Sequence, residues 1–160
     1  MNLEDGRLDS LSTQRQAALE LALGLRRELL IFSHDLDPLL LDREDWLEAV
    51  RQFVIRSRHT RARILVIDST RAIREGHGLV RLAQRLSSHI AIHRAHPDDA
   101  DNPDAFLVAD GVGYLHRPNA TRWEGSWARQ SGAEARRLEK RFDTMWERSQ
   151  PETEFRNLKL

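Results

Sequence analysis

Three short apolar runs, separated by stretches of helical periodicity, constrain the fold of this chain more than any other feature. The runs are Glu28–Ser33, Arg63–Asp68 and Ile90–His93. Their length and continuous apolar character are typical of strands buried on both faces. Between them, residues 43–57 and 78–87 place apolar side chains three or four positions apart, as amphipathic helices do. This alternation predicts an α/β fold in which helices flank a mixed, mostly parallel sheet.

A β-hairpin is predicted after the third run. The stretch Asp104–His116 is largely apolar on both sides of Asp110-Gly111. Asp-Gly is a favoured two-residue hairpin turn because both residues tolerate positive φ. The hairpin would add antiparallel strands to the sheet, and the polar, acidic residues 96–103 before it are expected to form an exposed loop.

Two further helices are predicted near the ends of the chain. The first extends to about Leu25 and is capped by Ser12 or Thr13. The second is a long charged helix from Ala133 to about Ser149. Residues 117–132, which precede it, are rich in Trp, Arg, Gly and Ser, and we expect them to be irregular.

These elements predict a single domain over residues 12–149. A polar lead-in of residues 1–11 would precede it, and a tail of residues 150–160 would follow. A chain of 160 residues is long enough to bury a sizeable core.

The composition excludes several classes of function. Lys plus Arg and Asp plus Glu both number 25, and this neutrality argues against strong nonspecific binding to nucleic acid or anionic membranes. Without cysteine, the chain forms no disulfide, thiolate nucleophile or Cys-based zinc site. No apolar stretch approaches transmembrane length and residues 1–6 do not resemble a signal peptide, so we expect a cytoplasmic protein with no membrane partner.

Polar residues follow the first two predicted strands, at the edge of the sheet where ligands usually bind. They are His34 and Asp35 after the first strand, and Asp68 and Ser69 at the end of the second. One interpretation assigns them acid–base chemistry or cation binding. The other assigns Asp35 to a turn and Asp68 to the cap of the following helix.

His93 is a further candidate ligand-binding residue. It is spaced four residues from His89 and three from His96. Because a strand rises about 3.3 Å per residue, these side chains would be too far apart to chelate one ion. We therefore predict no metal and no cofactor.

The segment of residues 117–129 contains the most suggestive cluster, with Arg117, Asn119, Arg122 and Trp123 as its candidate residues. Arginine forms bidentate contacts with phosphate, and tryptophan stacks on bases, so the segment could hold a phosphate, a nucleotide base or a peptide. The alternative is a loop whose tryptophans pack on the core or on a dimer partner.

The order of strands, helices, hairpin and final helix resembles one half of a phospholipase D-like domain. That family carries the catalytic motif HxKxxxxD, with GSxN six residues later. If Asp110 is the Asp of the motif, its His and Lys positions are occupied by Pro103 and Ala105, and the GS pair by Arg117-Pro118. The chain is most similar to non-catalytic proteobacterial domains of this type, some of which are fused behind a GNAT-type acetyltransferase.

The catalytic step of the family that this chain resembles needs side chains that the chain lacks at the matching positions. In the family, His attacks phosphorus and Lys stabilises the phosphate oxygens. Pro103 cannot act as a nucleophile and Ala105 carries no charge, and the first lysine of the chain is Lys140.

The resemblance therefore implies a non-catalytic binding or regulatory domain. We expect it to act as a homodimer, since catalytic members join two halves, and to recognise an anionic ligand or a partner protein. By family analogy that partner would be an acetyltransferase. The alternatives are a divergent phosphodiesterase or nuclease that uses His93 or His116, and a nucleic-acid-binding module that uses residues 117–129.

Overall fold

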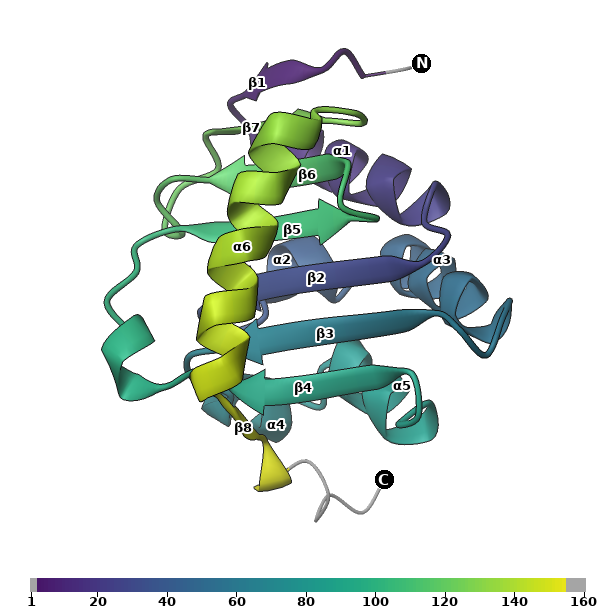
Figure 1. Ribbon diagram of the computed structural model, residues 1–160, viewed down its shortest axis with the longest axis vertical. Coiled ribbons are helices and arrows are strands. Elements are labelled where there is room, and N and C mark those ends of the chain that lie inside the picture. Colours follow the sequence, from purple (N-terminus) through teal and green to yellow (C-terminus); the bar gives the residue numbers. More distant parts are fainter. Residues whose placement is uncertain (1–2, 155–160) are drawn as a thin grey trace.

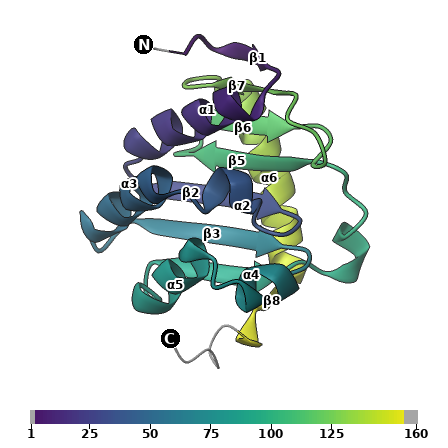
Figure 2. The same ribbon diagram turned by 180° about the vertical axis from the view of Figure 1, so that it is seen from behind.

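A single eight-stranded sheet with helices on both faces forms the body of the protein. The structure, a computed structural model, describes residues 3–154. The strand order is β1-β7-β6-β5-β2-β3-β4-β8 (Figures 1 and 2). The predicted α/β class and mixed sheet are confirmed.

Parallel pairing is confined to the centre of the sheet, where β2 pairs with β3 and β3 with β4. All other pairings are antiparallel, so the expectation that the sheet is mostly parallel needs correction. The hairpin is the reason, because it places two antiparallel strands beside β2 and two further strands extend them. The strands are β1 (Gly6–Leu8), β2 (Glu28–Ser33), β3 (Arg61–Val66), β4 (Ile90–Arg94), β5 (Ala105–Ala109), β6 (Gly113–Arg117), β7 (Gly125–Ala128) and β8 (Gln150–Pro151).

The helices divide unequally between the two faces. Helix α6 crosses one face alone, and the other helices cover the opposite face (Figures 1 and 2). The cap of α1 is Ser10 rather than the predicted Ser12 or Thr13, and Ser10 forms a capping box with Thr13. The helices are α1 (Leu11–Leu23), α2 (Pro38–Leu41), α3 (Glu44–Ile55), α4 (Thr70–Arg74), α5 (Gly78–Arg85) and α6 (Gly132–Arg148), with a 3-10 turn at Pro97–Asp99.

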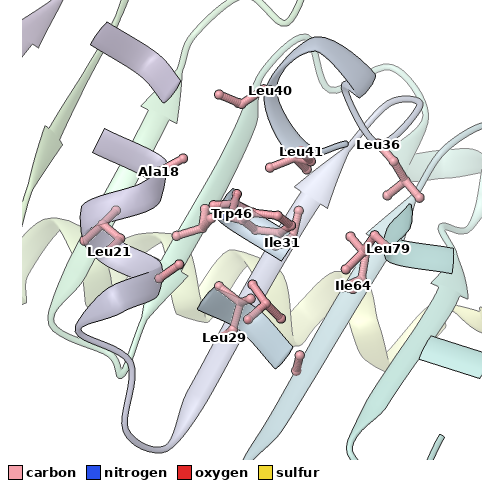
Figure 3. Packing of buried hydrophobic residues seen from close by; sticks show 14 of the residues in the cluster. Ala18, Leu21, Leu29, Ile31, Leu36, Leu40, Leu41, Trp46, Ile64 and Leu79 are labelled. Atoms are coloured by element: carbon pink, nitrogen blue, oxygen red, sulfur yellow. The ribbon is translucent and has the colours of Figure 1, made fainter. Parts of the chain in front are cut away.

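Alternation along the central strands builds two cores. Leu29, Ile31 and Ile64 point to the face covered by α1 and α3, where Trp46 fills the centre (Figure 3). Their neighbours in sequence point to the other face and pack against α6. Burial on both faces explains why these strands read as continuous apolar runs.

The predicted hairpin turn is present, with φ of 55° at Asp110 and 69° at Gly111. The Asp110 carboxylate also accepts hydrogen bonds from the backbone N–H groups of Arg26, Arg27 and Glu28 at 3.0, 2.7 and 2.9 Å. Asp110 therefore ties the hairpin tip to the beginning of β2, a structural role.

Three strands lie in segments that we expected to be irregular. In the predicted lead-in, Gly6–Leu8 forms β1 and pairs with Gly125–Trp127 of β7. In the predicted tail, Gln150–Pro151 forms β8 against the end of β4. β1 and β8 are short and lack polar–apolar alternation, and each pairs with a strand distant in sequence. The remainder of the predicted tail, residues 155–160, lies outside the described residues.

Among residues 3–154, no helix combines the length and apolar character needed to span a membrane.

Candidate functional site

Five strands, β1, β2, β3, β4 and β6, end at one side of the sheet, which we call the carboxyl edge. It consists of residues 34–37, 67–69, 95–104 and 117–124, and lies on the left of Figure 1. Ligands of open α/β sheets bind beyond the carboxyl ends of strands. All of the candidate residues except His93, which lies within β4, belong to this edge.

A buried aspartate, Asp104, is the centre of the tightest polar cluster at the carboxyl edge. Its Oδ2 lies 2.8 Å from His116 Nε2, and Arg141 of α6 donates to both carboxylate oxygens at 2.7 and 3.0 Å. Burial alone raises the pKa of Asp104, but the hydrogen bonds from His116 and Arg141 outweigh it and hold that pKa well below its ordinary value. The carboxylate is therefore ionised and fully engaged.

His34 and Asp35 hold the loop after β2 in place. His34 Nε2 lies 2.9 Å from the carbonyl oxygen of Asn102, which joins two segments of the edge. Asp35 Oδ1 accepts the backbone N–H of Asp37 at 3.0 Å, as in the predicted turn role. Leu36 and Asp37 both have positive φ, at 67° and 34°, which is rare for residues other than glycine.

Asp68 and Ser69 each make a hydrogen bond that stabilises the segment after β3. Asp68 Oδ1 accepts the backbone N–H of Thr70 at 3.0 Å, and this hydrogen bond lowers the pKa of Asp68. Ser69 is buried and its Oγ donates to Glu152 Oε2 at 2.9 Å. The predicted helix cap at Asp68 is therefore wrong in detail, because the N-cap residue of α4 is Ser69, without a side-chain cap hydrogen bond, and Asp68 forms an Asx turn just before it. Ser69 binds the segment after β8.

His93 lies apart from the other candidates. Its ring stacks on Trp146 at a centroid distance of 3.7 Å, and its Nδ1 lies 2.8 Å from Ser149 Oγ. Burial lowers the pKa of His93, so the neutral imidazole is favoured. In the part of the chain that the structure describes, no three His, Asp or Glu side chains are grouped to hold a metal ion.

Arg117 points into the protein rather than to solvent, with 2% of its surface exposed. Its Nη2 lies 2.7 Å from Asp37 Oδ1 without the alignment of a hydrogen bond, and its guanidinium lies 4.7 Å from the ring centroid of Trp123. The Trp123 carbonyl in turn accepts a hydrogen bond from Gln14 Nε2 at 2.9 Å. The side chains of Arg117 and Trp123 thus pack against each other inside the carboxyl edge.

A small internal cavity remains beside Arg117. Its volume is about 20 Å³, and its lining includes Gln14, Arg117 and Ala105. Gln14 Oε1 and Arg117 Nη2 are both buried without a hydrogen-bond partner. A space of this size with two polar atoms fits a single water molecule.

The two remaining candidates are at the surface. Asn119 Oδ1 accepts the backbone N–H and hydroxyl of Thr121 at 2.9 and 2.7 Å, which makes a local turn. Arg122 is exposed. The structure thus brings Arg117 and Trp123 together but places Asn119 and Arg122 outside that pair.

Sequence reasoning missed Asp104, Arg141 and Gln14 as members of the edge. Arg141 lies in the predicted long charged helix and Asp104 begins the predicted hairpin, so neither residue stands out from its neighbours in sequence. One signal was available for Arg117, because it lies two residues after Leu115 and so shares the face of β6 that Leu115 buries.

The segments that follow β2, β3 and β4 have one sign of charge. They contain seven aspartates and no arginine or lysine, namely Asp35, Asp37, Asp68, Asp98, Asp99, Asp101 and Asp104. The arginines that reach them come from elsewhere, and four of them are paired with these aspartates, namely Arg71 with Asp35, Arg117 with Asp37, Arg141 with Asp104 and Arg148 with Asp99. The carboxyl edge therefore offers few free cations to an anion.

The fold is similar to those of phospholipase D-like proteins of known structure. Nuc from Salmonella typhimurium, a phospholipase D family member, matches with a TM-score of 0.57 at 11% identity, over 84% of this chain and 87% of that chain. NucT from Helicobacter pylori matches with a TM-score of 0.60 at 10% identity, over 92% and 98%. The expected phospholipase D-like fold is therefore confirmed.

A third similar structure is TrmBL2, described as an archaeal chromatin protein with a novel mode of DNA binding. It matches with a TM-score of 0.65 at 12% identity over 94% of this chain, which spans 55% of the TrmBL2 chain. No curated protein sequence matches. The family described as Domain of unknown function (DUF7931) matches residues 10–158.

Proposed function

We propose a non-catalytic binding role for this chain, which belongs to the family described as Domain of unknown function (DUF7931). The domain would use a phospholipase D-like fold to recognise other molecules rather than to cleave phosphodiesters. A homodimer and a partner protein at the carboxyl edge are parts of the same proposal.

The observation that carries the proposal is the filling of the edge where the family's motif residues would lie. Ala105, at the Lys position of the motif, is buried and lines the cavity of about 20 Å³. Arg117, a cation in the lining of that cavity, is already paired with Asp37. The space suits one water molecule and is too small for a phosphodiester.

The charge of the carboxyl edge indicates which kind of partner it suits. Four of the seven aspartates in the connecting segments are paired with arginines. The other three, Asp68, Asp98 and Asp101, are exposed and would repel a phosphate group and attract a basic protein surface. A symmetric dimer through this edge would bring two such sets of aspartates together. We therefore expect dimerisation through residues 33–38 and 117–129 to strengthen as ionic strength rises.

One observation favours the divergent phosphodiesterase as a second candidate. The Asp104–His116 pair, at 2.8 Å, is a geometry that a general base uses. Arg141 binds the same carboxylate through both oxygens, however, which offsets the charge that Asp104 would lend to an imidazolium.

Hydrolysis of bis(p-nitrophenyl) phosphate separates the two candidates. We expect no turnover above the uncatalysed rate from the wild-type protein, from His116→Ala or from His93→Ala. Turnover that disappears in His116→Ala, while the variant keeps its thermal unfolding midpoint, would overturn the non-catalytic proposal.

Light scattering at low and high salt tests the dimer. A monomer under both conditions would remove the homodimer from the proposal.

A further inference from the structure

The side of the sheet opposite the carboxyl edge carries the reverse charge. We call it the amino edge, because β2, β3 and β4 begin there; it lies on the right of Figure 1. The segments that enter these strands, residues 24–27, 56–60 and 86–89, contain no aspartate or glutamate. They contain Arg26, Arg27, Arg56, Arg58, His59 and His89, with Arg61 and Arg85 at their borders.

We propose that the amino edge binds the phosphate backbone of a nucleic acid. The neutral net charge of the chain hides this surface because the opposite charges are separated to two edges of one sheet. The proposal does not depend on the absence of catalysis at the carboxyl edge.

Four arginines at or beside the amino edge have no carboxylate partner. Arg26, Arg27, Arg58 and Arg136 are exposed, and none of them forms an ion pair with a carboxylate in the part of the chain that the structure describes. Guanidinium groups in this state suit the bidentate contacts that phosphates accept.

Most acids near the amino edge are engaged elsewhere. The exception is Glu139, which lines the same groove as Arg136 and makes no ion pair in the described part of the chain. Glu28 Oε2 lies 2.6 Å from Arg61 Nε and 3.4 Å from Arg63 Nη2. The Asp110 carboxylate accepts three backbone N–H groups, and Arg129 pairs with both Asp5 and Glu20. These contacts reduce the repulsion that an approaching phosphate would meet.

The hairpin tip separates two open grooves at this edge. One, of about 490 Å³, has Arg27, His59 and Arg136 in its lining. The other, of about 870 Å³, has Arg26, Arg27 and Arg129. Arg27 borders both grooves, so it lies at the centre of the proposed surface.

The beginning of α6 adds a second kind of anion-binding feature. This helix has 17 residues, and its N-cap residue Ser131 makes no side-chain hydrogen bond to the first turn. A Cβ atom at Gly132 would lie 2.8 Å from Arg136 Nη1, so the guanidinium lies directly over that turn. The positive end of the helix dipole and the Arg136 charge therefore act at one place.

The dimensions of the amino edge suit a polymer better than a small anion. Five adjacent strands, from β4 through β3, β2 and β5 to β6, begin or turn there. At about 4.8 Å between strands they span about 19 Å, which corresponds to about six phosphates along one strand of a duplex. An anionic membrane is the competing occupant because Leu23, Ile55 and Val112 are exposed, but hollow grooves fit a phosphate backbone better than a flat lipid surface.

Fluorescence anisotropy with labelled single- and double-stranded oligonucleotides of about 20 nucleotides tests the proposal. The variant combines Arg27→Gln with Arg136→Gln, and the matched control is Arg122→Gln, an exposed arginine of the carboxyl edge. We expect the Kd to rise at least about tenfold in the double variant at 0.1 M salt, and the salt slope to fall by about two. The control should change the Kd less than about twofold.

Three outcomes would overturn the proposal. The first is no binding of either oligonucleotide at low salt. The second is loss of binding in Arg122→Gln while the double variant binds as tightly as the wild type, which would favour residues 117–129. The third is binding to vesicles rich in phosphatidylserine but not to oligonucleotides. Anisotropy is independent of the hydrolysis assay, so failure of this proposal and failure of the non-catalytic role remain distinguishable.

Discussion

The two edges of the sheet use charged side chains in opposite ways. At the carboxyl edge, the largely buried Asp37 pairs with Arg117 and the buried Asp104 pairs with Arg141, so these charges stabilise loops. At the amino edge, Arg26 and Arg27 are exposed and make no such pairs in the described part of the chain. A polar residue at the ligand-binding edge of an α/β sheet is therefore not identified as a ligand-binding residue by its position alone.

Removal of Asp104 should give the largest loss of stability. In Asp104→Ala the Arg141 guanidinium loses both of its carboxylate hydrogen bonds in a partly buried position. Breaking a buried pair from one side costs about 3–5 kcal/mol in the free energy of unfolding. Urea denaturation measures this change, and Asp101→Ala, at an exposed position of the same loop, should stay within about 0.5 kcal/mol. Equal losses would mean that the cluster is not the support described above.

A pair of arginine substitutions compares the edges directly. Arg117→Ala leaves Asp37 without its cation and removes packing from Trp123, for a loss of about 2–4 kcal/mol. Arg27→Ala removes an exposed side chain and should change the free energy of unfolding by less than about 0.5 kcal/mol. Calorimetric unfolding midpoints measure both. If Arg27→Ala is the more destabilising of the two, the contrast between the edges is wrong.

Acidification should weaken the carboxyl edge through Asp104. Because the folded-state pKa of Asp104 is lowered, the unfolded chain takes up its proton first as the pH falls. The stability from this group is present above its unfolded pKa of about 3.9 and is lost as the pH falls from there towards the folded value. The free energy of unfolding of Asp104→Asn should therefore decline less steeply than that of the wild type below about pH 4. Parallel declines in urea titrations at several pH values would assign acid sensitivity to other groups.

The sequence contained enough to predict the central strands and the long helices, because burial on one or two faces leaves a periodic pattern. β1 and β8 escaped prediction since Gly6–Leu8 and Gln150–Pro151 pair with partners more than 50 residues away. The site was harder for a similar reason. Whether Arg117 faces solvent or core depends on its pairing opposite Ala105 and on Trp123 packing over it, and neither contact leaves a local signature.

Asp68 provides the smallest of the expected effects and the finest test of the carboxyl edge. Unlike Asp104 it is exposed, and its carboxylate accepts the Thr70 backbone N–H at 3.0 Å. Asp68→Ala should lower the free energy of unfolding by about 0.5–1 kcal/mol, within the range for loss of one hydrogen bond. Because the pKa of Asp68 is lowered, this stability is present above the unfolded pKa of about 3.9 and disappears as the pH falls below it. Asp68→Asn should retain most of the stability, since its amide oxygen can still accept the Thr70 N–H. Urea titrations of both variants at neutral pH measure these changes. Equal losses of free energy of unfolding in Asp68→Ala and Asp68→Asn would show that Asp68 contributes through its charge rather than through its hydrogen bond.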